Sequence, residues 1–221
     1  DRFGMVNERL TLGHGVWLNE KDIDRLASAG GCVCHNCSSN FRLRSGVAAL
    51  NFFEKKGINT AIGLDEAGIN DDRDMLQELK LVLRAHRVPG MVEEDVPTMA
   101  QVLRMATVGG ARTTPFGATL GTLEVGKAAD MVLIDWDSVA YPYLDELTPT
   151  LDAVVHFVMT AKNSARYRTG AGGDHQCGFG DRRVGAQHRV THVPSHRPGD
   201  QHAVGVAWRG DTTDADALDI I

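Results

Sequence analysis

Apolar runs alternate with amphipathic segments three times in the first 90 residues, and a polar residue follows each apolar run. Continuous apolar runs of this length are typical of strands buried on both faces. The segments between them repeat their apolar residues with the 3.6-residue period of a helix. The runs and the residues that follow them are 10–13 with His14, 32–34 with His35, and 58–64 with Asp65. The pattern predicts three consecutive strand–helix units.

Local signals predict where the helices begin and end. Asn19 is a suitable N-cap for the first helix, and Asp22 three residues later completes a capping box. The second helix is expected to end at Gly57, because glycine readily takes the left-handed conformation of a helix end. The third helix is predicted over 75–83, and Thr98 caps a further one.

Strands that alternate with helices favour an α/β fold with a parallel sheet. The C-terminal ends of parallel strands lie at one edge of the sheet, where α/β proteins build their sites. His14, His35 and Asp65 each follow a predicted strand. We therefore expect the three residues to be neighbours in space and to form the candidate site.

Composition excludes several classes of protein. A net charge of −6 and a hydrophobic content of 43% describe a globular chain without electrostatic attraction to nucleic acid or to an anionic membrane. No apolar run approaches the length that a bilayer span needs, and no signal peptide precedes the first unit. We therefore expect a cytoplasmic protein with neither nucleic acid nor membrane as a partner.

The stretch GCVCHNCSSN, residues 31–40, crowds three cysteines around one histidine. In a strand, Cys32 and Cys34 point to the same side and serve as small apolar residues, while Cys37 lies in the following loop. We favour this interpretation over a zinc site formed by His35 and all three cysteines, because structural zinc sites have longer spacings between their ligand pairs. A non-catalytic zinc-binding module remains the alternative from another class of function.

Four blocks of sequence, taken in order and spacing, resemble the amidohydrolase superfamily. They are LTLGHGVWLNEKDIDRLASAG, VCHNCSSNFRLRSGVA, AIGLDEAGINDDRDMLQELKLVL and GATLGTLEVGKAADMVLIDWD, and they cover roughly residues 9–156. The branch that they resemble most is that of the metal-dependent deaminases and chlorohydrolases. The resemblance implies the C-terminal portion of a (β/α)8 TIM barrel, with strands six to eight and their helices, plus part of a small β-domain.

The resemblance also implies roles for the polar residues at the strand ends. Asp65, at the end of strand eight, would bind one divalent metal ion, zinc or alternatively iron, and would relay the proton of the attacking water. His14, at the end of strand six, would hold the attacking hydroxide or the reacting group. His35, at the end of strand seven, and Glu66, beside the metal ligand, are the candidates for substrate binding. Glu66 would either pair with a substrate amine or face solvent.

These roles imply metal-dependent hydrolysis of a C–N bond, or of a C–Cl bond, in a small-molecule substrate, with deamination of a nitrogen heterocycle as the expected reaction. A cyclic-amide or dipeptide hydrolase of the same superfamily is the alternative. The metal-binding histidines of the family's strands one and five have no counterpart here, and Asp65 with His14 cannot supply three protein ligands. We therefore expect an incomplete fragment that is inactive alone and exposes surfaces prone to self-association.

The character of the sequence changes twice along the chain. Residues 1–115 predict a partial amidohydrolase barrel, and residues 116–162 predict a helix and a strand, at 131–134, that return to the small β-domain. Residues 163–221 are rich in Gly, Arg, His and Asp and have no sustained apolar period, which predicts an irregular tail. The abrupt change also fits a stretch that is not native to the protein.

Overall fold

The structure is a computed structural model that describes residues 2–65, 74–128, 131–135, 144, 147–157, 166–168, 203–208 and 218–220. Its strands are β1 (Thr11–Gly13), β2 (Cys32–His35), β3 (Asn59–Ile62), β4 (Met131–Asp135), β5 (Arg166–Arg168), β6 (Ala203–Trp208) and β7 (Leu218–Ile220). Its helices are α1 (Glu20–Ser28), α2 (Cys37–Arg42), α3 (Leu50–Lys55), α4 (Met75–Ala85), α5 (Met99–Arg104), α6 (Gly110–Arg112) and α8 (Thr150–Phe157), with helical turns η1 (Glu93–Asp95) and η2 (Met105–Gly109). None of the helices in these ranges is long and apolar enough to cross a bilayer.

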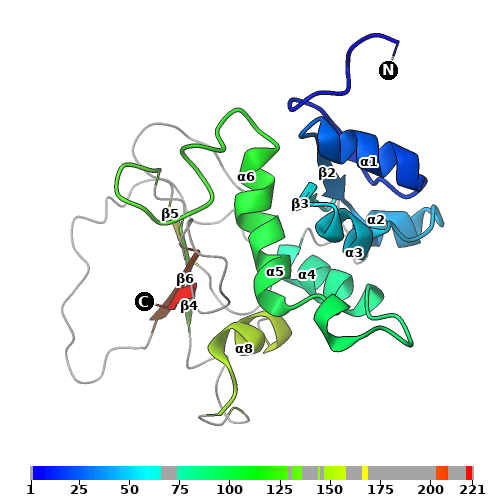
Figure 1. Cartoon of the computed structure of the whole chain (residues 1–221). Coiled ribbons are helices and arrows are strands. Elements are labelled where there is room, and N and C mark those ends of the chain that lie inside the picture. The colour runs from blue at the N-terminus through cyan, green and yellow to red at the C-terminus, as the bar shows by residue number, and fades with distance from the viewer. Residues whose placement is uncertain are drawn as a thin grey trace, which may run out of the picture.

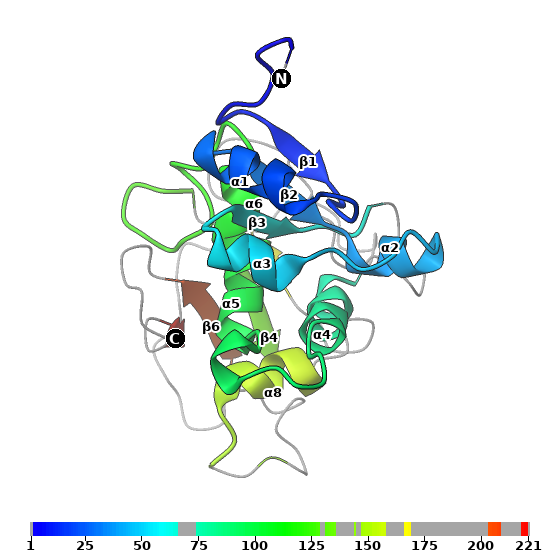
Figure 2. The same ribbon diagram turned by 45° about the vertical axis from the view of Figure 1, so that its right-hand side comes forward.

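The first three strands form a parallel sheet in the order β1-β2-β3, which confirms the predicted strand–helix alternation. Thr11 pairs with Cys32, and Cys32 pairs with Asn59. Figure 2 shows the three strands next to one another, with α1 and α3 over one face. Because a helix links each strand to the next, all three strands run in one direction and their C-terminal ends share an edge.

Two apolar clusters hold the helices against this sheet. The cluster that joins α1 and α3 to β2 consists of Ile23, Leu26, Val33, Ala48, Phe53 and Ile58. The cluster that joins α4, α5 and α8 to the end of β3 includes Ile62, Leu79, Val82, Val102 and Val155. Burial of an aliphatic or aromatic side chain of this kind contributes about 1.5–3 kcal/mol. The clusters therefore fix the strand ends on which the site is built.

Hydrogen bonds at the helix ends confirm the capping predictions. The Asp22 backbone N–H donates to the Asn19 side chain at 3.1 Å, and the Asn19 N–H donates to the Asp22 carboxylate at 3.3 Å. Thr98 and Gln101 form a second capping box at the start of α5. Gly57 follows α3 with a φ of 70°, which is the left-handed conformation expected there. Local sequence alone sets these boundaries.

One helical stretch, made of α5, η2 and α6, passes β3 and separates the two sheets (Figure 1). At Gly109 the helix approaches β3 so closely that an added Cβ would overlap the carbonyl oxygen of Thr60. The Asn59 side-chain amide donates to the Gly109 carbonyl at 3.1 Å. The crossing therefore requires glycine, because no side chain fits between the two backbones.

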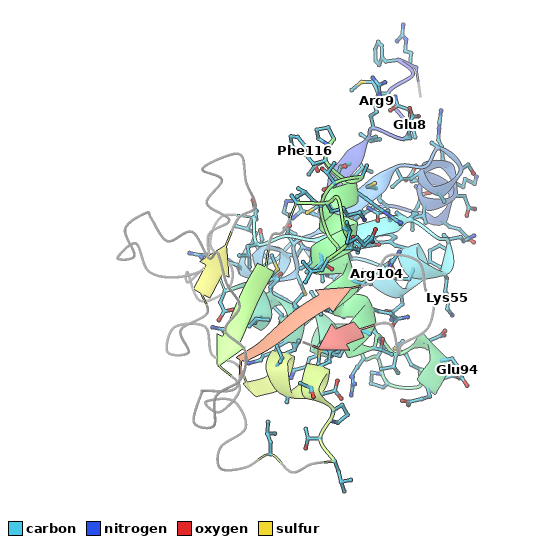
Figure 3. The ribbon with its side chains drawn as sticks, turned by 90° about the vertical axis from the view of Figure 1, so that its left-hand side faces the viewer. Glu8, Arg9, Lys55, Glu94, Arg104 and Phe116 are labelled. Carbon is cyan, nitrogen blue, oxygen red and sulfur yellow. The ribbon has the colours of Figure 1, made fainter. Side chains whose placement is uncertain are left out.

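The remaining strands form an antiparallel sheet in the order β5-β4-β6-β7. Figures 1 and 3 show this sheet on the other side of α5 and α6 from the parallel sheet. β4 confirms the strand predicted at 131–134. The range 163–221 was expected to be irregular, yet its described parts are three short strands, because their backbone groups pair across the sheet. The three-part division of the chain remains a prediction.

Candidate functional site

His14 and Asp65 lie side by side at the C-terminal edge of the parallel sheet. His14 directly follows β1, and Asp65 comes shortly after β3. His14 Nε2 and Asp65 Oδ2 are 3.9 Å apart, and the two side chains are 40% and 42% exposed. The structure thus brings together two residues that the sequence places on different strand–helix units, and both remain accessible to a small molecule.

Both residues have a left-handed backbone, with φ of 67° at His14 and 62° at Asp65. This conformation costs a non-glycine residue on the order of 1–3 kcal/mol and persists only where surrounding contacts hold it. One such contact is the hydrogen bond from the His14 backbone N–H to the Cys34 carbonyl, at 2.8 Å. Strained residues of this kind cluster at functional sites, which supports the choice of this pair as the site.

Two consecutive residues of α2, Ser39 and Asn40, form hydrogen bonds to this pair. The Ser39 hydroxyl donates to Asp65 Oδ2 at 2.7 Å, and His14 Nδ1 lies 2.8 Å from Asn40 Oδ1. Ser39 and Asn40 are themselves buried. Sequence reasoning did not identify either residue. The only signal was their place in a polar run directly after the second strand, because the contacts that they make are between distant parts of the chain.

The helix α2 begins at Cys37, and this corrects the prediction that Cys37 lies in a loop. Glu78 of α4 makes the early start possible, because its Oε1 accepts the Ser38 backbone N–H at 2.9 Å, at the positive end of the helix. Burial raises the pKa of Glu78, and the hydrogen bonds from α2 oppose that rise. The cap turns the chain into a helix immediately after β2, and this carries Ser39 and Asn40 to the site.

His35 ends β2 between the two site residues, but its ring lies on the helix side of the sheet. Alternation along the strand places it on the same side as Val33, and it is fully buried. His35 Nε2 lies 2.9 Å from His86 Nε2, and the rings meet edge to face. The structure therefore brings His35 to His86 and not to Asp65. Substrate binding by His35 remains a prediction, and Glu66 lies outside the described residues.

Acid should weaken the fold through these two histidines. Burial, followed by the neighbouring histidines, lowers the pKa of His35 to about 3, and burial lowers the pKa of His86 to about 4. Both histidines take up protons near pH 6.5 in the unfolded chain but not in the folded one. Their contribution to the stability of the fold is therefore complete above about pH 6.5 and is lost as the pH falls towards 4.

We expect the free energy of unfolding of the metal-free protein to fall between pH 7 and pH 4.5, by up to about 1.4 kcal/mol per pH unit for each histidine. His86→Gln should lose less over the same range, because glutamine takes up no proton. Glu78 has a raised pKa, so its own contribution to stability grows as the pH falls. Because wild type and His86→Gln both contain Glu78, this contribution cancels when the two proteins are compared. Urea unfolding at the two pH values measures both proteins, and equal losses would contradict the prediction.

The thiols of residues 32–37 lie on two sides of the sheet. Cys32 Sγ accepts from the Asn59 amide at 3.4 Å, and Cys34 Sγ donates to Asn36 Oδ1 at 3.5 Å. Burial, together with the charge of Asp65, raises the pKa of Cys34. Alternation along β2 places both thiols opposite His35. The four residues of the zinc-module alternative are therefore not brought together.

The His14–Asp65 pair fits part of a metal site. It offers an imidazole nitrogen and a carboxylate oxygen, which are donor types that zinc takes. A catalytic zinc needs three protein ligands and an open position. Among the described residues, the group of three that could hold an ion together is elsewhere, at His35, Cys37 and His86. The pair could therefore fill one or two positions of a metal site, and the other ligands would have to come from outside the described residues.

Two curated relatives cover the same part of the chain. A 5-methylthioadenosine/S-adenosylhomocysteine deaminase of Thermococcus onnurineus (strain NA1) is 35% identical over 164 residues, which are 74% of this chain and 37% of that protein. A 5′-deoxyadenosine deaminase of Methanosarcina barkeri (strain Fusaro) is 34% identical over 161 residues, with 73% and 35% covered. The chain thus spans little more than a third of the length of these relatives.

Solved structures show the same likeness. An adenosine deaminase from Xanthomonas campestris with bound zinc matches with a TM-score of 0.63 and 34% identity, over 71% of this chain and 35% of that one. An atrazine chlorohydrolase from Arthrobacter aurescens complexed with zinc matches with a TM-score of 0.62 and 28% identity, over 69% and 33%. These neighbours imply a TIM-barrel-type α/β fold. The family model for amidohydrolases matches residues 1–166, and the chain therefore belongs to the amidohydrolase family.

Proposed function

We propose that this chain supplies strands six to eight of a (β/α)8 barrel in a metal-dependent hydrolase that removes an amino group from a nitrogen heterocycle. The observation that carries the proposal is the His14–Asp65 pair, which two hydrogen bonds from α2 hold at the strand ends. Relatives named as deaminases of adenosine derivatives make an aminated purine the first substrate class to test. Zinc is the first metal to test, since two neighbours were solved with it.

Asp65 has two tasks in this proposal. Its carboxylate would hold the metal, and the chemistry that a metal supplies when bound is to lower the pKa of a water molecule to about 7. Oδ2 faces His14 and receives the proton of the attacking water, which it then passes to the leaving amine. The hydroxyl of Ser39 donates to Oδ2 and prevents the carboxylate from rotating.

His14 orients the reacting groups. With the Asn40 oxygen as acceptor, His14 carries its proton on Nδ1, and Nε2 keeps a lone pair directed towards Asp65. The 3.9 Å between Nε2 and Asp65 Oδ2 is too long for a hydrogen bond, and both atoms are then acceptors. A water molecule between them can donate one hydrogen to each. The pair thereby positions the nucleophile for attack on the ring carbon.

Activity requires more than the described residues supply. Asp65 and His14 leave at least one ligand position of a catalytic metal unfilled, and a metal with too few ligands binds weakly. We propose that the 221-residue chain alone does not turn over substrate and that the missing ligands belong to the part of the barrel that lies outside the matched region of its relatives.

A chimaeric protein tests this proposal. The part of the Thermococcus onnurineus relative that precedes the matched region is joined to residues 1–221, and ammonia release is measured with aminated purines, pyrimidines and triazines. We expect release by the chimaera that stops on chelation and returns with zinc, and none from the chain or the relative's segment alone. Turnover that continues at full rate after chelation would contradict metal dependence. Release of chloride without ammonia would indicate a chlorohydrolase instead of a deaminase. Opening of a cyclic amide without ammonia would indicate a cyclic-amide hydrolase.

Ser39→Ala should lower kcat/KM of the chimaera by about 10–100-fold, which is the usual cost of losing a partner of a metal ligand. Asn40→Ala should lower kcat/KM as well, because it releases His14, which orients the attacking water. Each change frees one of the two site side chains to rotate away. Ser28→Ala on α1 is the matched control, because its hydroxyl bonds only a helix carbonyl, Asp24 O, at 2.7 Å. Ammonia release and zinc affinity are measured for all three. An unchanged zinc affinity in Ser39→Ala would contradict its assigned contact with the metal ligand.

A further inference from the structure

A second group of side chains that could bind a metal ion lies near the start of α2, outside the His14–Asp65 site. His35 comes from the end of β2, Cys37 from the start of α2, and His86 from the end of α4. One donor atom of each lies within 4.8 Å of the others, and all three residues are at least 97% buried, with exposures of 0%, 1% and 3%. The elements of the parallel sheet and the first helices thus converge on three donors of the kinds that zinc and copper take.

Two features of this group favour a bound cation. His35 Nδ1 is a buried ring nitrogen without a hydrogen-bond partner among the described residues. Glu78, also buried, lies close enough for its charge to raise the pKa of Cys37, beyond the rise caused by burial, to about 12. A buried nitrogen without a partner costs about 1–3 kcal/mol. The Ser38 N–H compensates the Glu78 carboxyl in part, while the charge of that carboxyl disfavours ionisation of the Cys37 thiol.

We propose that His35, Cys37 and His86 form a structural binding site for a thiophilic metal ion, Zn²⁺ in the first place, that is distinct from the metal site at Asp65. The proposal does not depend on the hydrolase function. It assigns the metal-binding property to a different set of residues from the sequence-based zinc module, with His86 of α4 in place of Cys32 and Cys34.

Charge supports this assignment. Binding replaces the Cys37 thiol proton, which leaves to solvent, and the resulting thiolate with the ionised Glu78 balances the two positive charges of the ion. Both histidines are neutral at physiological pH, because burial lowers their pKa values, so each has one ring nitrogen without a proton that can bind an ion. A buried pair of acids that is unfavourable without the ion becomes a neutral group with it.

The distances require only small movements. Around a tetrahedral zinc with bonds of about 2.0–2.3 Å, neighbouring donors are roughly 3.3–3.8 Å apart. One donor atom of each residue already lies within 4.8 Å of the others, so the three donors would have to approach one another only slightly. Rotation of side chains covers such shifts, and the backbone of β2 and α2 stays in place.

Cobalt is the spectroscopic probe for this site. Co²⁺ is titrated into the metal-free 221-residue chain. We expect one ion per chain with a thiolate-to-cobalt charge-transfer band, displaced by Zn²⁺. Cys37→Ser and His86→Gln should abolish the band and weaken binding by more than the 10–100-fold that loss of an outer-shell partner costs. Cys34→Ser, Asp65→Asn and a Cys177→Ser control for the fourth cysteine should keep it.

Circular dichroism checks that each variant is folded. If Cys37→Ser fails to fold, His86→Gln still tests the site, because it leaves the thiol in place. Absence of a thiolate band in the folded wild-type chain would overturn the proposal. Persistence of the band in Cys37→Ser, or its loss in Cys34→Ser or Cys177→Ser, would overturn it as well. Loss of the band in Asp65→Asn would show that Asp65 belongs to the same metal site as Cys37, and it would overturn the proposal of two separate sites.

Discussion

Asp65→Asn lowers kcat/KM of the chimaera for ammonia release by about 10³-fold or more. A positioned acid or base alone contributes roughly 10²–10⁴-fold, and this change also replaces the proposed metal-binding carboxyl group by an amide. Asparagine keeps the size of the side chain and still accepts the Ser39 hydrogen bond, so the fold around the site should remain. More substrate should not rescue the variant, because the loss lies in the transition state.

Asp24→Asn provides the matched control for this variant. Asp24 lies on α1, where it forms an ion pair with Lys56 at 2.6 Å, and its side chain is 51% exposed. The same chemical change there alters only a surface contact of small energetic value. We expect wild-type ammonia release from Asp24→Asn. Full activity in Asp65→Asn would refute the assignment of Asp65, and a similar loss in both variants would show that the chimaera does not tolerate such changes anywhere.

Gly109→Ala destabilises the protein by about 3 kcal/mol or more, the upper part of the range for overpacking. The new Cβ would overlap the Thr60 carbonyl oxygen, and backbone atoms cannot move aside as a flexible side chain can. The shift would also disturb the hydrogen bond between the Asn59 amide and the Gly109 carbonyl. The strand that carries Asp65 would therefore lose its packing partner.

Gly110→Ala is the control, because it introduces the same methyl group at the next position of the same helical stretch. Its Cβ would meet only the Met105 carbonyl oxygen, at an ordinary contact distance of 3.9 Å. Alanine favours helix over glycine by up to about 1 kcal/mol, so this variant should be as stable as wild type or more so. Urea unfolding compares the two. Equal stability of the two variants would contradict the close approach of α5–α6 to β3.

Features that depend on neighbouring residues could be predicted from the sequence. The capping box at Asn19 and Asp22, the glycine end of α3 at Gly57 and the end of β1 before His14 follow from residue type and spacing over a few positions. The third strand was expected to reach Asp65, whereas β3 ends at Ile62. The parallel direction of the strands followed from the helices between them. These features were enough to expect that His14 and Asp65 meet.

Features that depend on distant residues could not be predicted. Asn40 meets His14 across 26 positions, and His86 meets His35 across 51, and neither contact has a local signal. Cys37 starts a helix because Glu78 of another helix caps it. The cysteine spacing left a zinc site of Cys32, Cys34, His35 and Cys37 open as the alternative, whereas alternation along β2 separates the first two thiols from His35. Such contacts depend on tertiary packing, which produces no periodic pattern in the sequence from which they could be predicted.

The anomalous X-ray signal of zinc in crystals of the chimaera tests most directly whether Asp65 is the catalytic metal ligand. We predict a zinc peak about 2.0–2.2 Å from a carboxylate oxygen of Asp65. The His14 ring should lie next to it, still bonded to Asn40. A zinc-loaded, active crystal with no zinc peak within bonding distance of Asp65 would contradict the site, whatever other metal positions it contained.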